Sequence, residues 1–237
     1  MKVIKKIIPK FIKSFIRQKK KKKLFFWGSF KKTEPVDRFF GYSRGTPIDR
    51  YYIDRFLESN KDSITGNVLE ISEDTYTKKF GSFVQESVVL HVKPEKVSTY
   101  NYLYGDLETG DGIPKDKFDC MILTQTLPFI FDIQSTLRNC HKSLKKNGVL
   151  LASVSSISQI SRYDMDNWGD YWRFTPLSVK LSFEKIFDKN KINIFEYGNV
   201  LTATSLLQGI STEELSKLEL DYSDQDYPVT IGVKAIK

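Results

Sequence analysis

Residues 118–154 read FDCMILTQTLPFIFDIQSTLRNCHKSLKKNGVLLASV and predict one strand–helix–strand unit. Residues 118–124 are a strongly apolar run with the length of a buried strand. Apolar residues at helical spacing follow over residues 133–144, and the KKNG turn at 145–148 ends that helix. Residues 149–154 form a second apolar run. Two buried strands joined by a helix are typical of a parallel sheet.

The same alternation extends on both sides of this unit. We expect further helices over residues 48–60, 75–80 and 177–187, and further strands over residues 68–71, 87–92, 100–104, 192–197 and 229–236. Residues 155–176 are rich in aromatics and read as irregular. This order predicts an α/β fold with a doubly wound, mostly parallel sheet covered by helices on both faces. Such sheets bind their ligands beyond the carboxyl ends of the strands.

The charge of the chain is divided unevenly. The net charge is +8, yet residues 1–33 hold twelve lysines, one arginine and no acidic residue. The remainder holds 24 basic and 29 acidic residues, a net charge of −5. The basic segment therefore reads as a leader of residues 1–33, ahead of a globular domain over residues 38–237. An acidic domain argues against nucleic acid as a partner.

The leader has two interpretations. Apolar pairs recur every four residues from Val3 to Ile16, a run of five lysines covers residues 19–23, and LFFW follows at 24–27. The first interpretation is an amphipathic helix that binds an anionic membrane surface through residues 1–32. The second is a disordered basic tail. The first would place a cytoplasmic protein peripherally on the inner face of the membrane.

Cysteine and histidine are scarce. Cys120 and Cys140 are the two cysteines, too few for a disulfide framework, and their spacing is not that of metal ligands. This usage fits a reducing, cytoplasmic compartment. We expect no metal site.

Three segments resemble the class I S-adenosylmethionine-dependent methyltransferases. Residues 68–75 (VLEISEDT) resemble the first strand with its acidic end, residues 118–125 (FDCMILTQ) the fourth strand, and residues 137–151 (LRNCHKSLKKNGVLL) the helix and strand that follow. The resemblance implies a Rossmann-like sheet with an antiparallel last strand, and S-adenosylmethionine as cofactor. Because the sulfonium is already activated, such an enzyme mainly orients donor and acceptor.

A narrower resemblance covers two further segments. Residues 44–52 (RGTPIDRYY) and 170–176 (DYWRFTP) are similar to methyltransferases found with glycosyltransferases in bacterial surface-polysaccharide gene clusters. This similarity implies O-methylation of a sugar or lipid-linked glycan in polysaccharide biosynthesis, with a glycosyltransferase as a partner. The alternative is a catalytically inactive module that keeps the fold and scaffolds the polysaccharide enzymes.

The cofactor-binding loop departs from the family pattern. Ser72 and Asp74 stand where glycines are expected, and aspartate tolerates the left-handed backbone that glycine takes there. His91 stands where the family has an acidic residue for the ribose. By resemblance, Glu70 would orient the amino-acid end of the cofactor and Asp106 would bind the adenine amino group. For these two, a carboxylate at a helix N-terminus and a turn aspartate are the alternatives. The expected cofactor-binding residues are Glu70, Ser72, His91, Asp106, Leu107, Thr124 and Gln125.

The acceptor site is expected after the fifth strand and before the first. Aromatic rings beside carboxylates suit a sugar, and a hydroxyl acceptor benefits from a base. Asp164, Asp166 and Asp170 are the candidates for the catalytic base. An aromatic loop packed over the sheet edge, with exposed ion pairs, is the alternative. The expected substrate-binding residues are Arg44, Thr46, Arg50, Tyr51, Tyr163, Trp168, Trp172 and Arg173.

Overall fold

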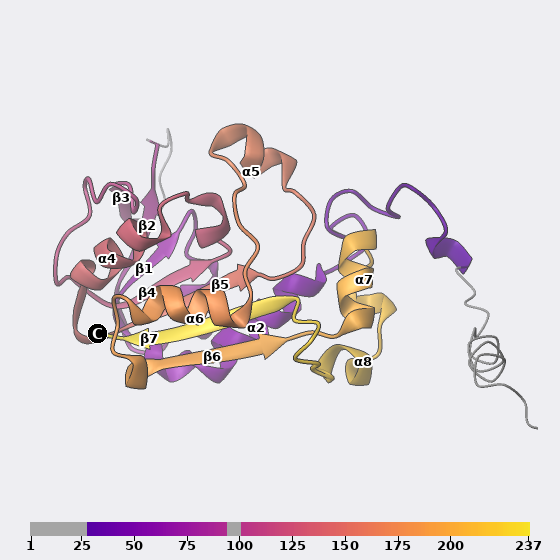
Figure 1. Ribbon diagram of the computed structural model, residues 1–237. Helices are drawn as coiled ribbons and strands as arrows, with labels where there is room; N and C mark the ends of the chain where they lie inside the picture. Colours follow the sequence, from indigo (N-terminus) through magenta and orange to yellow (C-terminus); the bar gives the residue numbers. More distant parts are fainter. Residues whose placement is uncertain (1–27, 94–100) are drawn as a thin grey trace, which may run out of the picture. The chain divides into compact units, whose positions relative to one another are not determined.

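The computed structural model describes residues 28–93 and 101–237. The chain divides into two compact units, Met1–Glu34 and Pro35–Lys237. In the first unit, the described part contains one 3₁₀ turn, Gly28–Phe30. The predictions for the leader rest on residues 1–27 and lie outside the described residues (Figure 1).

The second unit is built on one seven-stranded sheet (Figure 1). The neighbouring strands from β3 to β5 run parallel, and β7 runs antiparallel to both of its neighbours. This confirms the predicted fold class, including the antiparallel last strand. In spatial order the strands are β3 (Asn101–Tyr104), β2 (Val84–His91), β1 (Gly66–Ile71), β4 (Phe118–Thr124), β5 (Leu144–Ser155), β7 (Thr230–Ile236) and β6 (Ile192–Tyr197).

Helices cover both faces of the sheet because the central strands are apolar on both faces. On β4, Met121 packs into one core and Cys120 into the other, as expected for side chains that alternate along a strand. The first core includes Leu137 of α4 and Phe183 of α6, and the second includes Phe56 of α2. The helices are α2 (Ile48–Ser59), α3 (Thr75–Phe80), α4 (Ile133–Ser143), α5 (Arg162–Asn167), α6 (Pro176–Glu184), α7 (Val200–Gln208) and α8 (Lys217–Asp221).

Two parts of the secondary structure differ from the prediction. Strand β5 begins at Leu144 and runs through the expected KKNG turn, where Asn147 takes a positive φ of 65°. The segment 155–176 is not wholly irregular, because Ser161 accepts a hydrogen bond from the Asp164 N–H and starts α5. The short helices α7 and α8 were not predicted.

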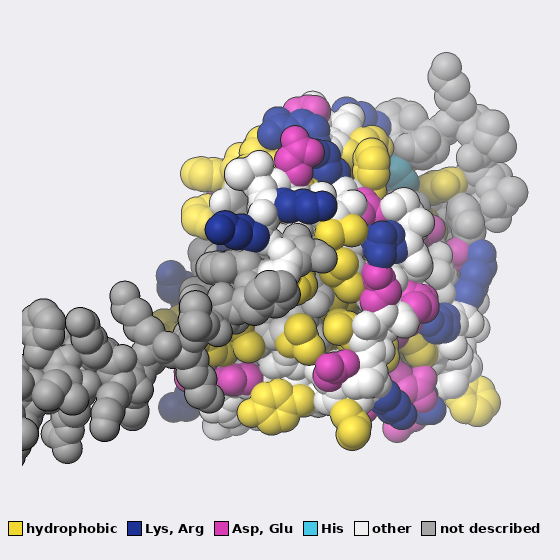
Figure 2. All heavy atoms as spheres, turned by 90° about the vertical axis from the view of Figure 1, so that its right-hand side faces the viewer, with side chains coloured by type: hydrophobic (Ala, Val, Ile, Leu, Met, Phe, Trp, Pro, Cys, Tyr) yellow, Lys and Arg dark blue, Asp and Glu magenta, His cyan; other side chains and the backbone are white. Residues whose placement is uncertain are grey.

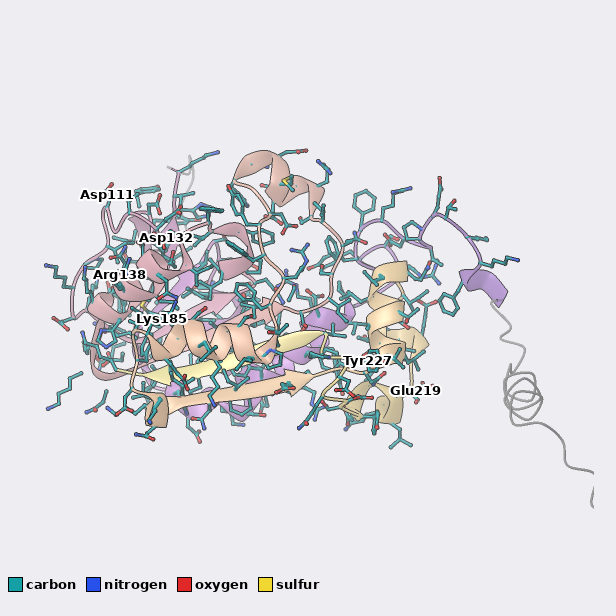
Figure 3. The ribbon with its side chains drawn as sticks, viewed as in Figure 1. Asp111, Asp132, Arg138, Lys185, Glu219 and Tyr227 are labelled. Carbon is teal, nitrogen blue, oxygen red and sulfur yellow. The ribbon has the colours of Figure 1, made fainter. Side chains whose placement is uncertain are left out.

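Side chains at the helix N-termini explain where several helices begin. Asp132 accepts the Ser135 N–H at 2.9 Å and caps α4, and Arg138 lies on the same helix (Figure 3). Glu219 accepts the Ser216 N–H at 2.8 Å, which closes a capping box at α8. Each cap satisfies a backbone N–H that the helix itself leaves unpaired.

The surface in Figure 2 is the face at the right-hand side of Figure 1. Basic, acidic and hydrophobic side chains are interspersed on its described part. In the described residues, no helix is long and apolar enough to cross a bilayer.

The close approach of α2 to β7 gives a stability prediction. An alanine Cβ at Gly232 would lie 2.4 Å from Cδ2 of Phe56, whose ring is fully buried. We expect Gly232→Ala to lower the free energy of unfolding by about 1–3 kcal/mol, measured by urea denaturation. Lys234→Ala on the same strand is the control and should change it by no more than about 0.5 kcal/mol. Wild-type stability of Gly232→Ala would contradict this packing.

Candidate active site

A cavity of about 420 Å³ lies at the carboxyl ends of the parallel strands. All seven residues expected to bind the cofactor line it, because each lies at or just after the carboxyl end of β1, β2, β3 or β4. Two residues of α5, Asp164 and Trp168, also line it. The lining residues that the sequence did not predict for this site include Glu73, Tyr76, Val92, Glu108, Thr126, Phe129 and Ile130.

Glu70 uses its carboxylate to hold the start of α3. One oxygen accepts the Tyr76 N–H at 3.0 Å, and the other accepts the Thr77 N–H and hydroxyl, each at 2.7 Å. Burial raises the pKa of Glu70, and these hydrogen bonds oppose the rise. The structure thus gives Glu70 the helix N-terminal contact that was one of its two interpretations, and the side chain also borders the cavity.

The loop after β1 bends at Ser72 and not at Asp74. Ser72 takes a positive φ of 67°, the left-handed backbone that glycine favours. Asp74 has a φ of −107°, and its buried carboxylate pairs with Lys78 at 2.8 Å. The expectation that Asp74 replaces a left-handed glycine is therefore wrong. His91 Nε2 lies 3.3 Å from the Ser72 carbonyl oxygen, at the edge of the cavity.

Asp106 organises the loop after β3. Its Oδ1 accepts the Glu108 N–H at 2.7 Å, so the turn interpretation of this aspartate holds in the structure. Asn139 of α4 donates from Nδ2 to the carbonyl oxygens of Leu107 and Glu108 at 3.0 and 3.2 Å. These bonds fix Asp106 and Leu107 at the border of the cavity.

Gln125 directly follows β4 and has a strained backbone conformation. Its φ is 49°, and its N–H donates to the Ser153 carbonyl at 2.9 Å. Its Oε1 accepts the Ser155 hydroxyl at 2.8 Å. Its Nε2 is buried and has no hydrogen-bond partner among the described residues. Backbone strain and an unpaired buried donor on one residue are typical of binding sites.

A second cavity of about 160 Å³ adjoins the first. Four residues line both cavities: Arg50, Gln125, Phe129 and Asp164. The second cavity is otherwise lined by Phe40, Tyr42, Asp49, Pro128, Ser155, Ser158, Gln159, Ser161, Asp170 and Arg173.

The three expected catalytic aspartates differ in position. Asp164 lines both cavities and accepts from Trp168 Nε1 at 2.8 Å and from the Ser161 hydroxyl at 2.5 Å. Asp170 lines only the smaller cavity. Asp166 lines neither, and its exposed carboxylate lies 3.5 Å from Arg162 Nη1.

The Asp170–Arg173 ion pair closes the segment that carries α5. Helix α5 projects away from the sheet, with a connecting segment at each of its ends (Figure 1). Arg173 binds both carboxylate oxygens, at 2.5 and 3.0 Å, and the Ser161 N–H donates to Asp170 at 3.0 Å. Burial raises the pKa of Asp170, but Arg173 and the Ser161 N–H outweigh burial and hold that pKa below its ordinary value. Asp170 is therefore a weak base.

Three of the eight expected substrate-binding residues line a cavity: Arg50, Trp168 and Arg173. The other five make structural contacts. Arg44 pairs with Glu214, Thr46 binds Glu213, and Tyr51 donates to Asp221 at 2.5 Å. Tyr163 packs edge-on against Trp168, and Trp172 donates from Nε1 to the Ile130 carbonyl at 3.1 Å.

The described residues contain no group of three or more histidine, cysteine, aspartate or glutamate side chains placed to hold a metal. Cys120 and Cys140 are buried, and burial raises the pKa of each thiol above its ordinary value. Neither thiol is suited to act as a nucleophile at neutral pH.

The Asp170–Arg173 clamp gives a second prediction. Arg173→Met leaves the buried Asp170 carboxylate with the Ser161 N–H, so we expect a loss of about 1–3 kcal/mol in unfolding free energy at pH 7. The loss should shrink in acid, because the pair stabilises the fold above the ordinary aspartate pKa and stops doing so as pH falls through the lowered pKa. Arg162→Met, which breaks an exposed pair, is the control and should cost less than about 0.5 kcal/mol. Equal losses in the two variants would rule out the clamp.

Comparisons with known proteins agree with this geometry. Residues 76–152 match the family model of a methyltransferase domain, and no curated protein matches the chain. A SAM-dependent methyltransferase from Archaeoglobus fulgidus is 16% identical with a TM-score of 0.52, over 85% of this chain and 100% of that one. One from Mesorhizobium loti is 15% identical with a TM-score of 0.52, over 77% and 98%. The N-methyltransferase NodS from Bradyrhizobium japonicum WM9, in complex with S-adenosyl-L-homocysteine, is 12% identical with a TM-score of 0.51, over 83% and 90%. The chain therefore has the fold of the class I SAM-dependent methyltransferases, and its residues 76–152 match a methyltransferase domain.

Proposed function

We propose that the protein transfers a methyl group from S-adenosylmethionine to a hydroxyl of a sugar or lipid-linked glycan. The observation that carries the proposal is the 420 Å³ cavity, which joins the ends of β1, β2, β3 and β4 in a chain with the class I methyltransferase fold. This volume lies within the range of about 300–1,000 Å³ for small-molecule sites.

The lining of the larger cavity fits such a cofactor. Apolar side chains (Ile71, Val92, Leu107 and Ile130) suit the faces of a flat base. Asp106 would bind its amino group, and Ser72 and His91 would face the ribose. S-adenosylmethionine supplies an activated methyl group on a sulfonium, so the protein has to orient the acceptor, exclude water and take up a proton.

The smaller cavity is the proposed acceptor site. It shares four residues with the larger cavity, so a group held there lies next to the cofactor site. Phe40, Tyr42 and Phe129 offer aromatic surface, and Gln159 and Arg50 offer polar groups. This combination suits a sugar. The link to surface polysaccharide and to a glycosyltransferase partner rests on the resemblance of residues 44–52 and 170–176.

A scaffold without catalytic activity is the second candidate function. Two carboxylates favour it, because both already have partners in α3. Glu70 accepts hydrogen bonds from Thr77, and Asp74 pairs with Lys78. Cofactor binding separates the two candidates.

Titration of the full chain with S-adenosylhomocysteine tests the proposal by calorimetry. We expect binding, and we expect Asp106→Ala to weaken it about 10- to 100-fold, because a hydrogen bond to a charged group is lost. Asp166→Ala is the matched control, since Asp166 lies outside both cavities. Folded protein that does not bind the ligand would instead support the scaffold.

The leader is proposed to bind anionic membrane through residues 1–32, which hold twelve lysines and one arginine among apolar residues. We expect the full chain to sediment with liposomes that contain anionic phospholipid, and a chain lacking residues 1–32 to stay in solution. Neutral liposomes are the control. Equal binding by the two chains would refute the membrane role.

A further inference from the structure

The smaller cavity is lined by three carboxylates, and two of them are already engaged. Asp170 is held by Arg173 and the Ser161 N–H. Asp164 accepts from Trp168 Nε1 and the Ser161 hydroxyl. The third is Asp49, which was not among the expected site residues.

Asp49 holds an unused acceptor. It lies in the first turn of α2, directly after the fully buried Ile48, and it lines the smaller cavity. Its Oδ1 is buried and has no hydrogen-bond partner among the described residues. An unpaired buried carboxylate oxygen costs stability, so such an atom is typical of a group kept for a ligand.

Gln125 supplies the complementary donor. It lines the same cavity, and its buried Nε2 also has no partner among the described residues. The Gln125 Oε1 accepts the Ser155 hydroxyl, so the Nε2 is the amide atom that remains available to a ligand. A hydroxyl group donates one hydrogen bond and accepts others, so its chemistry matches both an unpaired acceptor and an unpaired donor.

The geometry points to Asp49 and Gln125 as the subsite for the acceptor hydroxyl, with Asp49 as the catalytic base. Asp49 Oδ1 accepts the hydroxyl hydrogen, and Gln125 Nε2 donates to the hydroxyl oxygen. That oxygen forms a bond to the methyl carbon, the carbon–sulfur bond breaks with its electron pair on sulfur, and the proton passes to Asp49 and then to water. This assignment rests on the proposed function, because the methyl donor is S-adenosylmethionine.

The surroundings of Asp49 suit a base. Burial raises the pKa of its carboxyl above the ordinary value, and Arg50 and the first N–H groups of α2 oppose that rise without cancelling it. Arg50 also donates hydrogen bonds to two tyrosine hydroxyls, from Nε to Tyr42 at 3.0 Å and from Nη1 to Tyr76 at 3.4 Å. The other charged groups that line the cavity are Asp164, Asp170 and Arg173. A higher pKa makes a carboxylate a stronger proton acceptor near neutral pH.

The first test measures stability and cofactor binding without turnover. We expect Asp49→Asn to raise the urea midpoint of the full chain at pH 7.5, because the variant removes a buried charge whose desolvation outweighs the attraction of Arg50 and the α2 N–H groups. A raised pKa destabilises the folded state only above the ordinary aspartate pKa, so the gain should shrink as pH falls toward that value. S-adenosylhomocysteine affinity should be unchanged. The control is Asp54→Asn on the same helix, whose carboxylate pairs with Lys79 at 2.7 Å and which should give no gain.

The second test measures methyl transfer from radiolabelled S-adenosylmethionine to a panel of methyl glycosides of common hexoses. We expect Asp49→Asn to lower the rate by about 100-fold or more, while Asp54→Asn stays near wild type. A lower midpoint for Asp49→Asn, or transfer at the wild-type rate, would overturn the assignment. The proposed function fails separately, if wild-type protein does not bind S-adenosylhomocysteine. In that case, a raised midpoint for Asp49→Asn would still support a hydroxyl-binding subsite, and a lowered one would overturn it.

Discussion

The parallel pairing of β1 with strands on both of its sides is the constraint on which the site depends. Leu69 of β1 pairs with Val88 of β2 on one side and with Met121 of β4 on the other. The chain leaves β1 toward β2 and β3, and it returns across the sheet to β4. The connections that follow β1 and β4 therefore run to opposite sides and leave a crevice between them. The larger cavity lies there, and Ser72 and Gln125 border it from the two strands.

Ser72 and Gln125 both have a positive φ, and the surrounding sheet stabilises this conformation. Ser72 takes the left-handed backbone at a position where the sequence resemblance implies glycine, and Gln125 takes it with a long side chain. Such a conformation costs of order 1 kcal/mol or more for a residue with a Cβ. The hydrogen bonds of the Ser72 N–H to Leu90 and of the Gln125 N–H to Ser153 hold the two turns in place. Hydrogen bonds to the neighbouring strands thus offset the backbone strain that places Ser72 and Gln125 at the cavity.

The strands along the chain and residues that line the larger cavity could be predicted because they follow from local patterns. Apolar runs such as residues 118–124 identify buried strands, and a polar residue directly after a strand lies at the carboxyl edge of the sheet. The residues that line the smaller cavity could not be predicted in the same way. Arg44 and Thr46 contact Glu214 and Glu213, far away in the sequence, and no local pattern reveals such a pair.

Other differences between the sequence predictions and the structure concern residues on the same helical turn and helices with a weak sequence pattern. Asp164 and Asp166 are separated by one residue on α5, so they point to different sides of the helix, and only Asp164 lines the cavities. Asp49 lies between the expected residues Thr46 and Arg50, but no local pattern shows that its Oδ1 is buried beside a cavity without a hydrogen-bond partner among the described residues. Helix α7 has no charged side chain, so it lacks the charged face that often reveals an amphipathic helix.

Under the proposed function, the clamp at Asp170 has a consequence for the order in which substrates bind and products leave. Asp170 joins Ser161 and Arg173, so the two ends of the α5 segment are held together and would be displaced together. Trp168 borders the larger cavity, and Asp164 borders both. A single displacement of this segment would therefore expose the two cavities at the same time. Donor and acceptor would be enclosed as a ternary complex, and the release of the two products would share one opening step.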